Sequence, residues 1–226
     1  MIEELRKYIE LNRAVGEAHF LRCFTSLQSH NDEEEVFDDR DLFYLMCFCL
    51  LVPAGNADRT NLAVESLEEK GFYEDRLDPF TVLKTIESKV RFPKQKFSRL
   101  WEFYKNKKRN LNGIKKRLTQ NCNAQDFRDF LSNEIRGLGY KAASHYLRNI
   151  GFKELAILDV HILKYIKFFA PEYKDVTSSP TSKPKYLAIE KAFCYWAKEE
   201  FDIEPIILDW FIWCKEAKVP VDKFVR

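Results

Sequence analysis

The chain has 226 residues, of which 46% are hydrophobic and 32% charged, and its formal net charge is +2. This length can bury a sizeable core, either as one large domain or as two lobes of about 100 residues each. The longest apolar run, Leu42–Val52, is too short to cross a bilayer, and Glu3 and Glu4 interrupt any signal-peptide core. These features argue against a membrane protein, and we expect an intracellular address: the cytoplasm or nucleoid, or the nucleus of a eukaryote.

The residue composition favours an all-helical protein. Only seven glycines and eight prolines are present, and periodic apolar stretches fill most of the length. The six cysteines are scattered without zinc-type spacing, so we expect packing residues and no metal site. Residues 32–41 contain seven acids and one arginine, whereas residues 91–120 contain eleven lysines and arginines and one acid. This asymmetry permits a polyanionic partner, although a basic helix face is more often only solvated.

In chain order, the apolar periodicity predicts helices at 2–27 (one or two helices), 41–52, 58–70, 78–88, 94–104, 114–118, 124–136, 140–150 and 160–169. The helix at 41–52 is apolar all round and should be buried, and the Pro53-Ala54-Gly55-Asn56 segment should end it. A loop rich in Ser, Thr, Pro and Lys follows at 171–185, before two closing helices at 186–200 and 204–217. No internal repeat at solenoid periods is present.

Two glycines, Gly137 and Gly139, stand two positions apart between helical stretches. Glycine tolerates a left-handed turn, and a bare backbone lets phosphate oxygens approach the amides at the next helix's N-terminus. The helix that follows aligns Lys141, His145 and Arg148 on one face. The pattern predicts a phosphate cradle with Lys141 beside it. The alternative is a simple helix C-cap and tight turn, with Lys141 a surface charge.

A second polar position, Asp159, follows a short apolar run at 155–158 and precedes the predicted helix at 160–169. Aspartate is a preferred N-cap residue, because its side chain accepts hydrogen bonds from the first free amides of a helix. Asp159 is therefore predicted to cap this helix. From local pattern alone, it remains open whether the carboxylate does anything else.

The segments GLGYKAASHYLRNIGF, ILDVHILK and LDWFIW, with an Asp-x-His 18 positions after the hairpin lysine, resemble the helix-hairpin-helix (HhH-GPD) superfamily of DNA glycosylases. Within it, they are most similar to the archaeal-type 8-oxoguanine DNA glycosylase/AP lyase family. The resemblance is specific across 134–164 and weaker across 42–61 and 207–219. Val160 stands where archaeal members usually carry Arg, and Asp-Val-His is the version seen in eukaryotic 8-oxoguanine glycosylases. The four clustered C-terminal cysteines of endonuclease III relatives are lacking, so we expect no iron–sulfur cluster.

The resemblance implies a bifunctional DNA repair enzyme, a DNA N-glycosylase and AP lyase that excises 8-oxoguanine from duplex DNA. Lys141 would be the nucleophile that forms a Schiff base, Asp159 the essential carboxylate, and β-elimination would follow. Gly137, Gly139 and His161 would contact DNA, and a monovalent cation can assist at the hairpin; no other cofactor is expected. The expected partner is double-stranded DNA containing a damaged base, bound by a monomer.

Base recognition is predicted from position in the family pattern. Phe92 and Trp213 lie where archaeal-type enzymes sandwich the extrahelical base, although both could be ordinary core aromatics. Asp209 could bond the base edge or merely cap its helix. Asn56 falls where relatives fill the gap left by the flipped base, and the alternative is an Asx turn or helix cap. The tail at 220–226 continues past the terminus that archaeal members use to reach the lesion, which leaves the exact lesion open.

We therefore expect an all-α fold of two helical lobes with an interdomain active-site cleft. Residues 1–31 and 153–226 would form a terminal lobe, and residues 32–152 a helical barrel lobe with the hairpin at about 126–150. Two other interpretations stay open: the same chemistry on another oxidised base, and a non-catalytic helix-hairpin-helix module that only holds DNA. The second predicts salt-dependent binding without Schiff-base chemistry, and Lys141 together with Asp159 argues against it.

Overall fold

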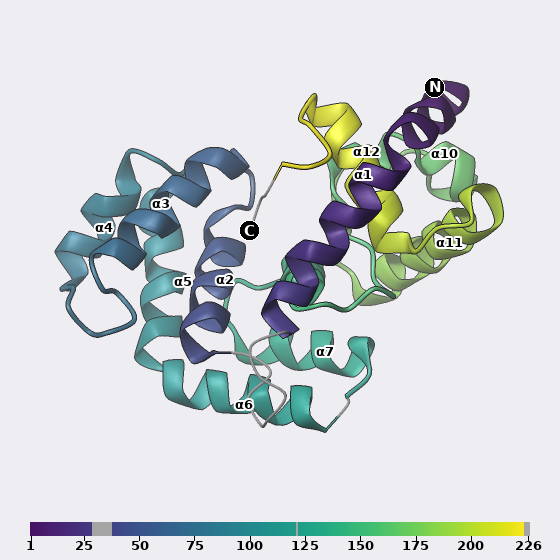
Figure 1. The fold of residues 1–226 in the computed structure, drawn as a ribbon. Helices are drawn as coiled ribbons and strands as arrows, with labels where there is room; N and C mark the ends of the chain where they lie inside the picture. The colour runs from purple at the N-terminus through teal and green to yellow at the C-terminus, as the bar shows by residue number, and fades with distance from the viewer. Residues whose placement is uncertain (29–37, 121, 224–226) are drawn as a thin grey trace. The chain divides into compact units, whose positions relative to one another are not determined.

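The computed structural model of the protein describes residues 1–28, 38–120 and 122–223, and in these ranges it contains helices and no strand (Figure 1). The predicted all-α fold is confirmed. No helix within these ranges is both long enough and apolar enough to span a membrane. Most of the acidic segment at 32–41 and the last three residues of the tail lie outside the described residues.

The described residues divide into two compact units. Residues 1–28 and 139–223 form one, here called the terminal unit, and the described residues between 38 and 138 form the other, the middle unit. Both ends of the chain were expected to share a lobe, but the boundary falls between Leu138 and Gly139 rather than at 152. The helix after the hairpin belongs to the terminal unit because Tyr140 packs its ring against Tyr186, and the Arg148 guanidinium lies over the Trp210 ring.

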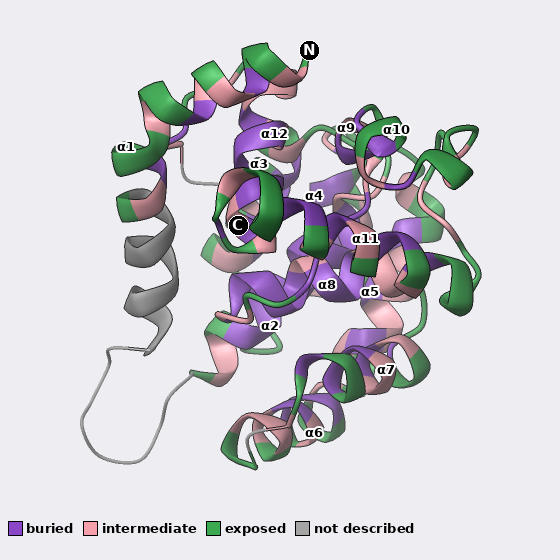
Figure 2. Cartoon of the chain, turned by 90° about the vertical axis from the view of Figure 1, so that its right-hand side faces the viewer, coloured by how far each residue is buried: buried purple, intermediate pink, exposed green. Residues whose placement is uncertain are grey.

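The middle unit is built around one buried helix. Its elements are α2 (Asp39–Leu51), α3 (Ala57–Glu69), α4 (Pro79–Glu87), α5 (Pro93–Lys105), α6 (Lys107–Thr119) and α7 (Ala124–Glu134). Every residue of α2 from Leu42 to Leu51 is buried, as Figure 2 shows in purple, and α2 packs against α3, α5 and α6. An apolar surface on all sides requires such a central place, so the prediction of a buried helix here is confirmed.

Helix starts in the middle unit follow the sequence signals closely. The side chains of Asp38, Asn56, Asp78 and Asn123 each accept a backbone amide at the start of the next helix, and Pro79 occupies the first turn of α4. The one large difference is α6, which begins at Lys107 instead of 114. Its first turn, Lys107–Asn110, contains three basic residues and no apolar one, so apolar periodicity does not reveal it.

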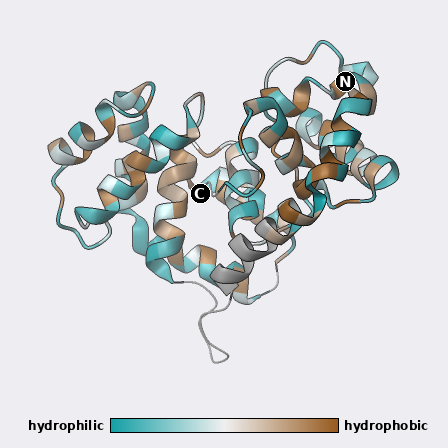
Figure 3. Ribbon diagram, turned by 45° about the horizontal axis from the view of Figure 1, so that its top comes forward, coloured by the Kyte–Doolittle hydropathy of each residue, from teal (hydrophilic) through white to brown (hydrophobic). Residues whose placement is uncertain are grey.

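The terminal unit joins the two ends of the chain. It consists of α1 (Ile2–Gln28), α8 (Tyr140–Asn149), α9 (Val160–Leu163), α10 (Ile166–Phe169), a 3-10 turn at Pro171–Tyr173, α11 (Lys183–Phe201) and α12 (Pro205–Ala217). Helix α12 contacts α1, α9 and α11. Gly16 lets α1 approach closely, because a Cβ there would lie 2.5 Å from Cε1 of Phe211. Figure 3 shows hydrophobic and hydrophilic residues alternating along these helices, as amphipathic elements around a core require.

The single helix predicted at 160–169 is wrong, because the chain forms α9 and α10 with a break at Lys164 and Tyr165. The amide of Tyr165 bonds to the carbonyl of Ile162 at 2.9 Å, which tightens the turn, and the Tyr165 side chain is fully buried. A buried aromatic at the junction redirects the chain in a way that apolar spacing alone does not show.

Candidate functional site

Asp159 begins α9 and acts as its N-cap. Its Oδ1 accepts the amides of His161 and Ile162 at 2.8 and 3.0 Å, so the predicted cap is confirmed. The carboxylate is held at the positive end of a helix turn, where a negative charge is well placed. Val160, directly after it, is exposed, while Nδ1 of the half-buried His161 has no hydrogen-bond partner among the described residues.

Lys141 lies in the first turn of α8, two residues after the cap Gly139, and is half-buried. The ring before it, Tyr140, packs 5.5 Å from the ring of Tyr186, which fixes this end of α8 against α11. A second lysine, Lys183, lies over the same Tyr140 ring with Nζ 5.9 Å from the ring centre. Lys141 therefore lies at a helix start that packs against α11.

Asp209 links these two predicted residues electrostatically. It is 3% exposed on α12, and its Oδ2 accepts the amide of Ile157 at 2.6 Å. The pKa of Asp209 is raised to about 7, first by burial and then by the charge of Asp159, which together outweigh the lowering effects of Arg148, the Ile157 amide and Lys141. Lys141 and Asp159, which come from separate parts of the sequence, are thus brought within electrostatic range of one buried acid.

Asp209 does not cap its helix, because α12 begins four residues earlier at Pro205 with Glu204 as the N-cap. The capping alternative for this residue is therefore wrong. Its side chain instead accepts the amide of Ile157, two residues before Asp159. The predicted contact of Asp209 with a base edge stays a prediction.

The apolar run at 155–158 is buried and irregular, and its amides are bonded by side chains. Ala156 N donates to Oε1 of Glu190 at 3.0 Å, Ile157 N to Asp209 at 2.6 Å, and Leu158 N to Oη of Tyr186 at 3.3 Å. The Tyr186 hydroxyl in turn donates to the Ala156 carbonyl at 2.8 Å. We call Tyr186, Glu190 and Asp209 the amide clamp.

Sequence interpretation missed two members of the amide clamp, although a signal for one was present. The buried positions of α11 include Tyr186, Ile189, Glu190 and Phe193, so a glutamate occupies the apolar stripe of an amphipathic helix. A charged residue in such a stripe needs a buried partner. Which backbone group supplies that partner cannot be read from α11 alone.

The two glycines of the hairpin have different roles. Gly137 has φ +89°, a left-handed conformation, and a Cβ there would collide with the Arg99 side chain. Gly139 has φ −75°, which any residue adopts, and no described atom lies within 4 Å of where its Cβ would be. Gly137 is needed for the turn itself, whereas Gly139 leaves an open approach to the amides at the start of α8.

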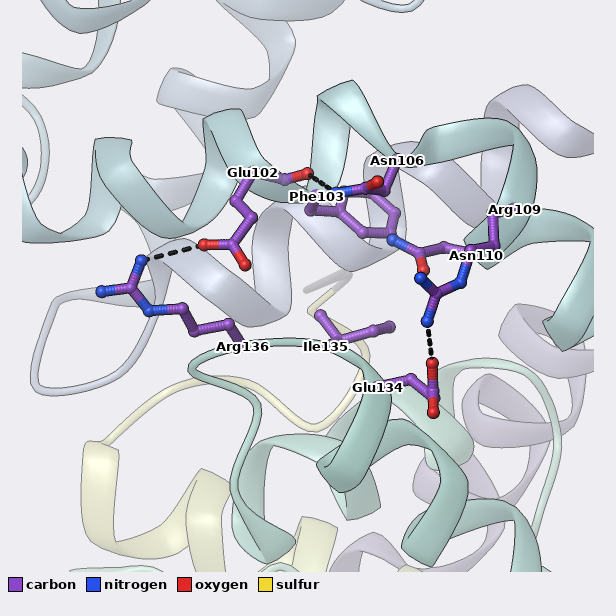
Figure 4. Close-up of a pocket in the computed structure, with 8 residues that line it drawn as sticks. All are labelled: Glu102, Phe103, Asn106, Arg109, Asn110, Glu134, Ile135 and Arg136. Atoms are coloured by element: carbon purple, nitrogen blue, oxygen red, sulfur yellow. Dashed lines mark hydrogen bonds and ion pairs between the residues drawn. The ribbon is translucent and has the colours of Figure 1, made fainter.

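A polar pocket of about 240 Å³ lies beside the hairpin within the middle unit (Figure 4). Arg136, the residue before Gly137, pairs with Oε2 of Glu102 on α5 at 2.9 Å, and Arg109 on α6 pairs with Glu134 at the end of α7. These ion pairs attach both sides of the α7–hairpin junction to α5 and α6. None of the predicted site residues lines the pocket.

Phe92 and Asn56 lie in loops of the middle unit. Phe92 is 57% exposed and has φ 55°, a strained left-handed conformation for a bulky residue, so the alternative of a core aromatic is wrong for it. Asn56 caps α3 by accepting the Arg59 amide at 2.9 Å, which is the capping alternative; its side chain is exposed. Nearby, Nζ of the buried Lys96 donates to the carbonyl of Leu51 at 2.5 Å, and burial lowers the pKa of Lys96 to about 8.

Trp213 is half-buried on α12 and stacks on Trp210, with ring centres 5.2 Å apart. Nε1 of Trp210 donates to the carbonyl of Val221 at 3.0 Å, and the Cys214 thiol approaches the Pro220 carbonyl at 3.8 Å. The described part of the tail is thus held along the same helix that carries Asp209 and Trp213.

The basic stretch at 91–120 is only partly a solvent face. Lys96 is buried, Lys107 pairs with Asp75, Lys115 pairs with Asp39, and the guanidinium of Arg117 lies over the Phe130 ring. Six basic side chains of the stretch are exposed: Arg91, Lys94, Lys105, Lys108, Arg109 and Lys116. The surface charge available to a polyanion is therefore smaller than the sequence count indicates.

A family model and individual relatives of this chain carry the same description. The Ogg-HhH family model, described as 8-oxoguanine DNA glycosylase, matches residues 19–201. The 8-oxoguanine DNA glycosylase/AP lyase of Thermoplasma acidophilum is 35% identical over 176 residues, 78% of this chain and 80% of that one. The enzyme of the same description from Methanocaldococcus jannaschii is 31% identical over 192 residues, 84% of each chain.

Solved structures give the same result. The crystal structure of the 8-oxoguanine DNA glycosylase of Thermotoga maritima matches with a TM-score of 0.76 at 26% identity, covering 98% of this chain and 97% of that one. The Methanocaldococcus jannaschii 8-oxoguanine glycosylase/lyase, in complex with 15mer DNA containing 8-oxoguanine, matches with a TM-score of 0.76 at 25% identity, covering 96% and 99%.

Proposed function

Because the chain belongs to the 8-oxoguanine DNA glycosylase family, we propose that it excises 8-oxoguanine from duplex DNA and then cleaves the strand as an AP lyase. In this proposal Lys141 is the nucleophile and Asp159 the essential carboxylate. The observation that carries the assignment of residues is that Lys141 and Asp159 stand at the hairpin and helix-cap positions that match the family motif, and that the charges of both act on the buried Asp209.

The first step is displacement of the base. The neutral amine of Lys141 attacks the anomeric carbon of the sugar, the bond between carbon and base breaks, and the base leaves with the electron pair and takes up a proton. Positive charge develops on the sugar as that bond breaks, and the ionised Asp159 beside it stabilises this charge. The amides of His161 and Ile162 hold the carboxylate in place without a further reorganisation cost.

The second step is strand cleavage. The Lys141 nitrogen loses one proton, and its lone pair then forms a double bond to the anomeric carbon. The bond from that carbon to the ring oxygen breaks, and the oxygen keeps the electron pair and takes up a proton. The product is an iminium ion, a Schiff base between Lys141 and the ring-opened sugar. Removal of a proton from the adjacent sugar carbon then lets the 3′ phosphate leave with its electron pair, which is a β-elimination. Hydrolysis of the conjugated imine releases Lys141 for the next turnover.

Other predicted residues supply recognition in the proposal. Phe92 is exposed and Trp213 half-exposed, so both have ring surface that can pack against an extrahelical purine. Asn56 is an exposed loop residue, and it fills the gap that the flipped base leaves in the DNA stack. Gly137, Gly139 and His161 contact the DNA backbone. A monovalent cation at the hairpin would need carbonyl ligands from the turn, where the Ile135 carbonyl already accepts the Leu138 amide. We propose that one copy of the protein acts on one duplex inside the cell.

The nucleophile is tested by trapping. Wild-type protein incubated with a duplex containing 8-oxoguanine and sodium borohydride should form a covalent protein–DNA adduct, because borohydride reduces the imine to a stable amine. Lys141→Gln should abolish the adduct and strand cleavage. Lys183→Gln is a matched control, since Lys183 also lies beside Tyr140, and its adduct should persist. The adduct is measured by denaturing gel electrophoresis.

An adduct that survives Lys141→Gln would assign the nucleophile to another amine. Duplexes with an oxidised pyrimidine or another oxidised purine in place of 8-oxoguanine test the substrate in the same assay. Faster excision of one of these would change the lesion while keeping the chemistry. Salt-dependent DNA binding without adduct or excision by wild-type protein would indicate a non-catalytic helix-hairpin-helix module.

A further inference from the structure

Three consecutive amides before Asp159 are bonded by three buried side chains from two other helices. Glu190 and Tyr186 on α11 and Asp209 on α12 accept the amides of 156, 158 and 157 respectively. Buried amides must find acceptors, but water or backbone carbonyls normally serve. Here two of the acceptors are carboxylates that are 4% and 3% exposed, and burying a carboxylate is costly.

The same clamp contacts the helix that carries Lys141. The Oη atom of Tyr186 lies 3.4 Å from Oγ of Ser144, which is one turn after Lys141 on α8, and the ring of Tyr186 packs against that of Tyr140. Tyr186 is fully buried, so these contacts are made within packed surroundings. One side chain therefore bonds both the Lys141 helix and the run that ends at Asp159.

We propose that Tyr186, Glu190 and Asp209 are positioning residues that set the carboxylate of Asp159 against Lys141 for base excision. The inference rests on the proposed function. Asp159 Oδ1 is engaged by the amides of its own helix turn, and the Asp159 amide bonds to the Ile157 carbonyl at 2.6 Å. The place of this carboxylate thus follows the backbone at 156–158, which the amide clamp holds.

The two halves of the reaction depend differently on that placement. Base excision develops positive charge on the sugar and needs a carboxylate close to it. At a preformed abasic site no base has to leave, because the ring-opened sugar presents an aldehyde that Lys141 attacks directly. A displaced Asp159 should therefore slow excision more than cleavage of an abasic site, whereas general destabilisation should lower both rates together.

The test uses Tyr186→Phe, which removes one hydroxyl and keeps the ring. Single-turnover rates are measured on a duplex with 8-oxoguanine and on the same duplex with an abasic site. Misplacement of a reacting group by about 1 Å costs up to roughly a hundredfold, so we expect excision to fall on the order of tenfold or more relative to abasic-site cleavage. Asp209→Leu, which removes the acceptor of Ile157 N, should shift the ratio in the same direction.

Tyr165→Phe is the matched control. Tyr165 is also fully buried in the terminal unit, and its hydroxyl donates to Oε1 of Glu216 at 2.8 Å, not to the run at 156–158. Removal of this hydroxyl should leave the ratio of the excision rate to the abasic-site cleavage rate at the wild-type value. Asp209→Asn adds a rescue arm, because the asparagine oxygen can still accept the Ile157 amide and should bring the ratio most of the way back from its value in Asp209→Leu.

A ratio in Tyr186→Phe equal to that in Tyr165→Phe would overturn the inference, whether both rates fall together or neither falls. Thermal unfolding of each variant identifies one that has not folded, in which case the ratio in the remaining clamp variant decides. Failure of the proposed function looks different, since wild-type protein itself would then show no excision and no borohydride adduct.

Discussion

Asp159 shows how one side chain can have a structural and a chemical role. As an N-cap it accepts two amides of α9, and these same bonds keep its carboxylate oriented for a positive charge on a sugar. Cap geometry and catalytic geometry are therefore compatible here. The cap itself was predictable from the sequence, because an aspartate directly before an apolar periodic stretch has few other local uses.

The charge state of Asp209 couples the stability of the protein to pH. Its pKa is raised from 3.8 to about 7, mainly by burial, so the folded protein binds its proton more tightly than the unfolded chain does. The stabilisation from this group is complete below about pH 4 and is lost as pH rises towards 7. The groups near it are Asp159, Arg148, Lys141 and the Cys214 thiol.

Asp209→Asn should remove this pH dependence, because asparagine keeps the acceptor for Ile157 N and does not ionise. The stability of the variant relative to wild type should rise between pH 5 and pH 8 by about 3 kcal/mol, because roughly two pH units of the range between the unfolded and folded pKa values lie in this window. Thermal or urea unfolding across this range measures it. Glu216→Gln is the control: burial raises the pKa of Glu216, but hydrogen bonds with Lys164 and Tyr165 and the charges of Lys164 and Lys215 outweigh it and leave the pKa lowered. The stability difference of this variant from wild type should therefore stay constant from pH 5 to 8. A pH-independent difference for Asp209→Asn would contradict the buried, titrating acid.

At the scale of elements, the two glycines of the hairpin have different structural roles. Gly137 occupies a left-handed backbone conformation against Arg99, whereas Gly139 is in an ordinary extended conformation with open space around it. A sequence pattern of two glycines does not separate these roles, since both positions look alike. The backbone dihedral angles of Gly137 and Gly139 distinguish the two roles.

We expect Gly137→Ala to destabilise the protein by about 1–2 kcal/mol, the usual cost of a left-handed conformation for an L-residue. Gly139→Ala should unfold at nearly the wild-type temperature but bind duplex DNA more weakly, because its methyl group enters the approach to the α8 amides. Differential scanning calorimetry and a fluorescence-anisotropy titration give the two values. Equal decreases of stability in both variants would show that the glycines share one role.

The elements that the sequence predicted well are those with local signals at both ends. Helices α2, α3, α4 and α7 begin at side-chain caps within two residues of the predicted starts. The segment at 160–169 was predicted as one helix and is two, because burial of Tyr165 in the terminal unit outweighs the local preference to continue. Caps act over one turn, whereas such a break is set by packing.

At the scale of the whole molecule, some basic side chains are engaged inside a unit and others are exposed to solvent. Part of the basic stretch at 91–120 is engaged inside the middle unit, by the Leu51 carbonyl and by acids such as Asp75 and Asp39. Lys108 and Lys116 on α6 are exposed. Exposed lysines of this kind contribute affinity for phosphates without reading sequence or damage.

Lys108→Gln combined with Lys116→Gln should weaken binding to damaged and undamaged duplexes by the same factor. The slope of log affinity against log salt should become shallower by about 0.9 for each phosphate that the variant no longer neutralises. Anisotropy titrations at several salt concentrations measure both values. Lys167→Gln, an exposed lysine on α10, is the control and should leave the slope unchanged. Weakening confined to damaged DNA would contradict a purely electrostatic role.

Taken by itself, the sequence determined the helical class, the buried α2, the hairpin with Lys141 and the cap at Asp159, because each depends on periodicity or on chemistry within one turn of chain. Only the tertiary structure decided that α8 joins the terminal unit, that Asp209 is a buried acid and that Tyr186 and Glu190 hold the run before Asp159. These depend on contacts between residues 28 to 62 positions apart, and the local sequence does not show which distant side chains come into contact.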